Sequence, residues 1–429
     1  MRVRTIKVEA LARVEGEGSI RVRLRGDEAI EVQFGIFEPA RFFEGFLRGR
    51  DCHEAPDLTS RICGICPVAY LMSACHAVED ALGVRVEGGL RALRRLLYCG
   101  EWIESHALHV FLLQAPDLLG YPDAIAMAAD HAEIVQRGLR MKKAGNAIVA
   151  ALGGRSIHPV NVRVGGFYRV PRPAELEELL PELRWGREAA RASLQWAANL
   201  RVPELERDYD FFALRHPDEY PFTEGRLTSS HGLDAPVGDY ERHLREEQVP
   251  HSNALQSHGE GGAEYCSGPL ARFNLDYDRL SEEARAAATA AGLAPPLRNP
   301  FKSVLVRLVE ILQAFGEAVA LIEAYTPPPA PYVPAPSRAA TGHGCTEAPR
   351  GALYHRYTVD EEGTITEANI VPPTSRNLAT IESDLRALAP QLAALPLPAA
   401  TLLAEQAVRN HDPCISCATH CLRVRIERG

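Results

Sequence analysis

Several features that would place the chain in a membrane, outside the cell or on nucleic acid are missing from the sequence. The formal net charge is −9, whereas a general nucleic-acid-binding protein usually has a basic excess. The longest uncharged run, 387–404, contains Pro390, Pro396 and Pro398, which prevent a straight membrane-spanning helix. Residues 1–9 lack the apolar stretch of a secretory signal. We therefore expect a cytoplasmic protein with no membrane span and no nucleic-acid partner.

A disulfide framework is also not expected, although the chain contains ten cysteines. Long chains without a secretory signal keep cysteines as thiols or metal ligands. Four of them form two Cys-x-x-Cys pairs, Cys63 with Cys66 and Cys414 with Cys417. Four thiolates are a full ligand set for zinc, iron–sulfur clusters, nickel or low-valent iron. A structural zinc site is the simplest interpretation, but the wide separation of the pairs disfavours a local zinc knuckle.

Hydrophobic periodicity predicts a mainly α-helical chain with small β elements at both ends, an α+β arrangement. Apolar residues alternate with arginines over 19–25, and 30–37 continues the alternation, which predicts two strands after an acidic loop at 13–18. Residues 203–275 are irregular, and we expect loops and short strands there. Helical spacing predicts a bundle core from helices over 89–114, 123–152, 171–200 and 301–325.

The C-terminal quarter begins with a proline-rich stretch, 327–336, which must run extended. A β-hairpin is predicted over 353–359 and 364–370, followed by helices near 376–388 and 399–410. No internal repeat is visible. We expect one domain over 1–420, made of a β-rich N-terminal part (1–40), a helical core (42–326) and a C-terminal active-site part (340–420), with 421–429 as a tail.

Taken singly, the polar residues of the conspicuous motifs have ordinary interpretations: Glu15 as a surface carboxylate, His158 as a loop histidine and Arg350 as a turn residue. Together, the motifs resemble the large subunit of nickel–iron hydrogenases over nearly the whole chain. The resemblance rests on Arg13-Val14-Glu15-Gly16, Arg61-Ile62-Cys63-Gly64-Ile65-Cys66-Pro67, Ser105-His106-Ala107-Leu108-His109, Gly153-Gly154-Arg155-Ser156-Ile157-His158-Pro159, Glu347-Ala348-Pro349-Arg350-Gly351 and Asp412-Pro413-Cys414-x-x-Cys417-x-x-His420. It implies the multihelical fold shared with the quinone-site subunit of respiratory complex I.

The resemblance implies two metal sites. Cys63 and Cys414 would be terminal ligands of nickel, while Cys66 and Cys417 would bridge it to an iron that carries two cyanides and one carbonyl. A magnesium, or occasionally iron, would lie near the C-terminus, where oxygen donors suit a hard cation. Its ligands would be Glu44, His420 and the backbone carbonyl of Ile370.

The implied activity is the reversible heterolytic cleavage of dihydrogen into protons and electrons. Cys414 would act as the base, and Glu15 would pass the proton outward. Arg350, fixed by Asp412, would cover the open coordination position. Pro349 and Thr374 would contact the cofactor, with Thr374 donating a hydrogen bond to a cyanide.

Three positions depart from the usual family pattern: Tyr70 replaces a histidine, Glu17 replaces a histidine, and Ser105 replaces an aspartate that accompanies the active-site arginine. The motif forms are similar to the cytoplasmic bidirectional branch, which includes NAD(P)-linked, sulfhydrogenase and deazaflavin-linked enzymes. The implied partners are an iron–sulfur small subunit and flavin- and NAD(P)-type diaphorase subunits.

The residues after His420 resemble a maturation tail, which a dedicated endopeptidase removes once nickel-insertion proteins have delivered the metal. Cys421 is then not expected to contact the metals. Two alternatives stay open. A hydrogen-sensing subunit would use the same site, although sensors generally lack the tail. A complex I relative would keep the fold without the four cysteines.

Overall fold

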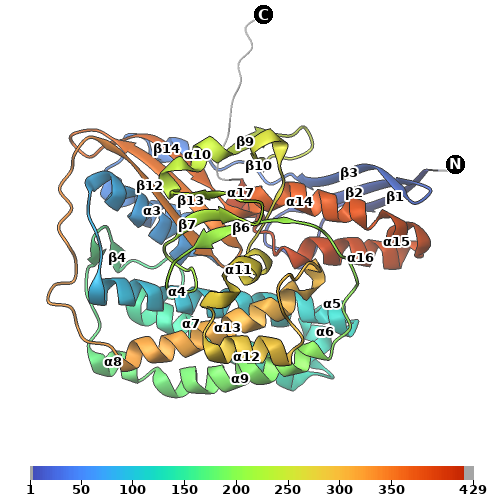
Figure 1. Ribbon diagram of the computed structural model, residues 1–429, viewed down its shortest axis with the longest axis horizontal. Coiled ribbons are helices and arrows are strands. Elements are labelled where there is room, and N and C mark those ends of the chain that lie inside the picture. Colours follow the sequence, from blue (N-terminus) through green and yellow to red (C-terminus); the bar gives the residue numbers. More distant parts are fainter. Residues whose placement is uncertain (1–2, 420–429) are drawn as a thin grey trace, which may run out of the picture.

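The computed structural model describes residues 3–419, and its largest part is a helical bundle (Figure 1). Helix α4 (Gly88–Leu108) packs along α7 (Ala132–Gly153), while α13 (Ser303–Glu323) contacts both α4 and α9 (Leu180–Ala198). The apolar faces of these helices form one core, as their spacing predicted. The short α12 (Glu282–Ala290) packs against α13.

The bundle differs from the predicted helices in three places, one of which is the expected helix over 171–200, divided into α8 (Pro173–Glu177) and α9. The expected single helix over 123–152 is wrong, because α6 (Ala124–Ala128) ends before α7 begins. Asp123 caps α6, since its side chain accepts hydrogen bonds from two backbone amides of the first turn. The expected helix over 89–114 continues beyond α4 as a π-helical turn, His109–Gln114, which leads into α5 (Ala115–Leu119).

Small antiparallel sheets stand at both ends of the chain, as expected, but each has three strands where two were predicted. The N-terminal sheet has the order β1 (Val3–Val8), β2 (Gly18–Arg25), β3 (Glu28–Ile36). Ile20, Val22 and Leu24 are buried on one face of β2, which confirms the predicted alternation. The C-terminal sheet has the order β12 (Ala340–Ala348), β13 (Gly351–Val359), β14 (Ile365–Val371).

Strand β12 was not predicted, because Gly342 and Gly344 do not favour a strand. Both glycines face α3 (Pro67–Leu82), and a Cβ at either position would collide with the backbone carbonyl of Ala77 or Ser73. The glycines therefore allow α3 to lie directly against the sheet.

The region over 203–275 contains short strands and loops, as expected: β6 (Asp210–Arg215), β7 (Arg226–Ser229), β8 (Asp234–Ala235), β9 (Leu244–Gln248), β10 (Leu255–Gly259) and β11 (Tyr265–Ser267). Helix α11 (Pro269–Asp276) follows them. Within the described part of the chain, no helix has both the length and the apolarity needed to cross a membrane.

Helices α14 (Pro373–Ala387), α15 (Ala389–Ala394) and α16 (Leu397–Asn410) cover the N-terminal sheet and form a second core with it. The final short helix, α17 (Ile415–Ala418), lies where the two cores meet. Ile415 and Ala418 belong to the second core, whereas Cys414 and Cys417 belong to the bundle core. The fold thus directs the second cysteine pair inward, towards the helical bundle.

Candidate metal centre

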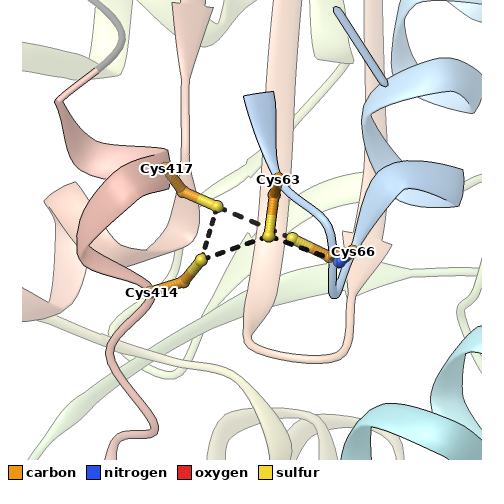
Figure 2. Close-up of side chains that lie close together, drawn as sticks. All are labelled: Cys63, Cys66, Cys414 and Cys417. Atoms are coloured by element: carbon orange, nitrogen blue, oxygen red, sulfur yellow. Dashed lines mark hydrogen bonds between the residues drawn. The ribbon is translucent and has the colours of Figure 1, made fainter. Parts of the chain in front are cut away.

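The two Cys-x-x-Cys pairs converge on one site (Figure 2). Cys63 and Cys66 immediately precede α3, while Cys414 and Cys417 belong to the turn of α17. All four Sγ atoms lie within 4.8 Å of one another, and no residue of the four is more than 3% exposed. Sγ of Cys63 lies 3.4 Å from that of Cys414, and Sγ of Cys66 lies 3.6 Å from that of Cys417. Four converging thiols shielded from water make a soft-metal site.

Burial and mutual hydrogen bonds shift the pKa values of the four thiols. Burial raises the pKa of the Cys414 thiol well above its ordinary value, whereas hydrogen bonds from Cys414 and Cys417 lower the pKa of Cys63. The backbone amides of Ile65 and Cys66 also donate to the Cys63 Sγ. Since thiolates are the ligating form and a metal lowers thiol pKa values, the donor set fits thiophilic metals.

Arg350 lies beside the four cysteines and is held by Asp412. Its Nε donates to the backbone oxygen of Asp412 at 2.8 Å, and its Nη2 donates to Oδ1 at 3.2 Å. Although burial raises the pKa of Asp412, the charge of Arg350 brings it below its ordinary value. Nη1 of Arg350 is buried and has no hydrogen-bond partner among residues 3–419. One guanidinium donor is therefore left for a ligand in the site.

Glu15 lies directly against Cys414, because the N-terminal loop forms an isolated parallel bridge with the C-terminal segment. The Cys414 thiol donates to Oε2 of Glu15 at 3.1 Å, and the backbone amide of Ser416 donates to the same oxygen at 3.0 Å. A titratable carboxylate thus stands at hydrogen-bond distance from a candidate metal ligand, as a proton relay requires.

Thr374 borders the site, and Pro349 directly precedes Arg350 in the chain. Oγ1 of Thr374, in the first turn of α14, accepts a hydrogen bond from the backbone amide of Cys414 at 3.1 Å. Pro349 is buried, and its carbonyl oxygen accepts from Nη2 of Arg272 at 2.9 Å. Thr374 therefore contacts the cysteine segment directly, whereas Pro349 is held by Arg272.

The predicted second metal site is described only in part. Oε1 of Glu44, in α1 (Phe43–Leu47), accepts from the backbone amide of Ile370 at 2.8 Å. The fold therefore brings these two residues together from opposite ends of the chain. His420 and the tail at 421–429, with Cys421, lie outside the described residues.

Two of the three departures from the family pattern are buried within the described residues 3–419. Tyr70, on α3, is fully buried, and burial together with the neighbouring Cys417 raises the pKa of its hydroxyl. Ser105 is also fully buried, and its Oγ has no partner in the same described range. Asp412 is therefore the carboxylate that binds Arg350 in the described structure.

Arg272 is a structural partner of the site that motif spacing did not reveal. It lies on α11 and is fully buried between the carboxylates of Glu310 and Glu347. Nη1 donates to the carbonyl oxygen of Ala348, and Nη2 to that of Pro349. Although burial raises the pKa of Glu310, the charge of Arg272 helps to bring it to about 2. An arginine between Ala271 and Phe273 in an otherwise apolar turn was the one local signal for this role.

We expect Arg272→Met to lower the free energy of unfolding by about 3–5 kcal/mol, because two buried carboxylates lose their cation. Urea unfolding of the purified protein, followed by circular dichroism, measures the change. Arg140→Met removes an exposed ion pair with Glu182 and a cation–π contact with the Trp185 ring, and it is expected to cost about 2 kcal/mol or less. Equal effects of the two substitutions would contradict the anchoring role of Arg272.

Comparison with known proteins identifies the same site region. The family model described as nickel-dependent hydrogenase matches residues 41–138 and 302–420, which contain all four converging cysteines. The chain is 32% identical over 423 residues to sulfhydrogenase 1 subunit alpha of Pyrococcus furiosus, with 98% of both chains covered. It is 26% identical over 476 residues to the NAD-reducing hydrogenase HoxS subunit beta of Cupriavidus necator, covering 98% of this chain and 95% of that subunit.

A solved structure agrees with the described fold. The crystal structure of an NAD+-reducing [NiFe]-hydrogenase in the H2-reduced state superposes with a TM-score of 0.88 at 29% identity. The superposition covers 97% of this chain and 99% of that one. The predicted mainly helical α+β fold is confirmed.

Proposed function

The chain belongs to the nickel-dependent hydrogenase family as a catalytic large subunit, and we propose that Cys63, Cys66, Cys414 and Cys417 hold its nickel–iron centre. Cys63 and Cys414 would hold nickel as terminal ligands, and Cys66 and Cys417 would be shared with the iron. The observation that carries this assignment is the convergence of four buried Sγ atoms within 4.8 Å. When bound, the two metals supply Lewis-acid polarisation of dihydrogen.

The residues of this chain then carry the proton. Sγ of Cys414 takes up the proton released by heterolytic cleavage and passes it to Oε2 of Glu15, 3.1 Å away. The backbone amide of Ser416 holds the carboxylate of Glu15 in this orientation. Burial of Cys414 keeps bulk water away, and Glu15 is the carboxylate at hydrogen-bond distance from its thiol.

We propose that Arg350, Thr374 and Pro349 contact the two cyanides and one carbonyl that the iron would carry. The buried Nη1 of Arg350 supplies a donor without a described protein partner, and Asp412 fixes the orientation of its guanidinium. Thr374 is assigned as the second donor, and Pro349, buried next to Arg350, is assigned to the wall of the site. These roles require charge-assisted hydrogen bonds in a water-excluded site, where they are strongest.

A magnesium or iron ion near the C-terminus is a further part of the proposal. Glu44 and the carbonyl of Ile370 are assigned to it with His420, and the contact between Glu44 and Ile370 supports the assignment. We further propose that residues 1–420 are the working domain. A maturation endopeptidase would remove 421–429 after nickel-insertion proteins have acted.

Electrons must leave the centre through another subunit. An iron–sulfur subunit is the proposed acceptor, followed by diaphorase-type subunits that reduce NAD(P) or another soluble carrier. The names of the relatives support this proposal, since they are subunits of sulfhydrogenase and NAD-reducing hydrogenase complexes. The nine described cysteines are all free thiols, which supports a reducing, cytoplasmic location. The relatives are enzymes and do not favour the hydrogen-sensing alternative.

Isotope exchange tests the proposed function. The purified complex, kept in D2 and H2O without air, is expected to release HD and H2. Cys63→Ser removes a proposed terminal ligand and is expected to abolish the exchange, whereas Cys99→Ser changes a buried thiol outside the four-cysteine cluster and is expected to retain it. Exchange that survives in Cys63→Ser would contradict the assigned centre.

A further inference from the structure

The proposed proton donor and acceptor lie on segments from opposite ends of the chain. Three hydrogen bonds join these segments directly at the pair. The Cys414 thiol and the Ser416 amide donate to the Glu15 carboxylate, and the Ile415 amide donates to the Glu15 carbonyl. Each segment includes a non-glycine residue in the left-handed region, Arg13 at φ 61° and Asp412 at φ 50°. Such backbone is held only where surrounding contacts determine it.

One carboxylate, that of Asp117 on α5, binds both segments. Oδ1 of Asp117 accepts from Nη2 of Arg13, which stands two residues before Glu15. Arg409, at the end of α16, donates from Nε to Oδ2 at 2.7 Å and from Nη2 to Oδ1 at 3.0 Å. The side chains of Asp117 and Arg409 are each only 1% exposed, so that this bidentate pair is shielded from water.

Further hydrogen bonds connect the side chains of Arg13 and Arg409 to the backbone around them. Nη1 of Arg409 donates to the carbonyl oxygen of Ala12, which links the two segments a second time. Nη1 of Arg13 donates to the carbonyl oxygen of Leu113, in the π-helical turn before Asp117. The same turn contacts the C-terminal segment, since Nε2 of Gln114 donates to Oδ1 of Asn410 at 2.9 Å. A π-helical turn is an uncommon feature that often marks functional regions.

We propose that Asp117 is a positioning residue for proton transfer: by binding Arg13 and Arg409 together, it sets the distance between Cys414 and Glu15. The inference rests on the proposed function of that pair. Without the carboxylate, the guanidinium groups of Arg13 and Arg409 lose the negative charge that they share, and Glu405 remains a partner of Arg409 alone. Repulsion between the two cations then moves the two segments apart. The four cysteines keep their contacts with one another. Proton transfer is therefore expected to become slower, while metal binding is unchanged.

Asp117→Asn in the complete complex tests the proposal, because the amide keeps the shape of the side chain and removes its charge. We expect unchanged nickel and iron contents and unchanged infrared bands. Exchange of D2 with solvent protons is expected to fall about 10–100-fold, since a displacement of about 1 Å can cost 100-fold. The solvent isotope effect on turnover is expected to rise as proton transfer becomes limiting.

Two further variants separate positioning from general stability. Arg13→Gln removes the charge that binds the N-terminal segment to Asp117. The double variant Arg13→Gln/Asp117→Asn is expected to exchange no more slowly than the slower of the two single variants. Glu405→Gln removes a partner of Arg409 that lies 3.4 Å away and does not contact Arg13, and it is expected to leave exchange within twofold.

Two results would overturn the proposal: exchange within twofold of the unmodified complex in both Asp117→Asn and Arg13→Gln, or loss of nickel from either variant. If Asp117→Asn does not fold, the solvent isotope effect on turnover of Arg13→Gln tests the proposal instead. A value equal to that of the unmodified complex overturns the proposal. Failure of the proposed function itself is distinguishable, because the unmodified complex would then lack both metals and exchange.

Discussion

Glu15→Gln is expected to reduce turnover and hydrogen–deuterium exchange by about 100–10,000-fold while both metals stay in place. The amide has nearly the shape of the carboxylate, but it cannot take the proton that Cys414 donates, and a positioned general base contributes an effect of this size. Dye reduction under hydrogen, exchange with D2 and metal analysis measure the three quantities on one preparation.

Glu17→Gln is the matched control, because Glu17 is an exposed carboxylate two residues away in the same loop. Its turnover is expected to remain within twofold of the unmodified complex. If exchange survives unchanged in Glu15→Gln, the proton leaves by another route and the role of Glu15 is wrong.

Cys414→Ser is expected to lower the nickel content by about tenfold or more and to abolish turnover. The hydroxyl is a hard donor with a much higher pKa than a thiol, so it replaces a soft thiolate poorly. Cys345→Ser changes another fully buried thiol that lies outside the metal-ligand cluster, and it is expected to keep its nickel. Elemental analysis of both purified variants makes the comparison, and full nickel content in Cys414→Ser would contradict the ligand assignment.

Local patterns were sufficient for most of the fold. The alternation in β2 and the helical spacing in α4 and α13 depend on which face of an element is buried, and this is visible within a short window of sequence. The break before α7 was missed, because alanine-rich sequence satisfies helical spacing on both sides of it. Strand β12 was missed because its glycines are explained only by the close approach of α3.

The candidate site was predicted from motifs, but its geometry was not. Spacing grouped Cys63 with Cys66 and Cys414 with Cys417, whereas the approach of the two pairs to each other depends on packing between the bundle and the N-terminal sheet. Arg272 and Asp117 lie outside the motifs that carry the resemblance. Their importance comes from buried ion pairs with residues far along the chain, which no local pattern records.

Metal analysis combined with infrared spectroscopy of the purified complex tests the proposed nickel–iron centre most directly. We predict one nickel and one iron bound by the four cysteines, with absorption bands of metal-bound carbonyl and cyanide. The bands should disappear in Cys414→Ser and persist in Glu15→Gln. A single zinc ion with no carbonyl or cyanide bands would contradict the nickel–iron assignment.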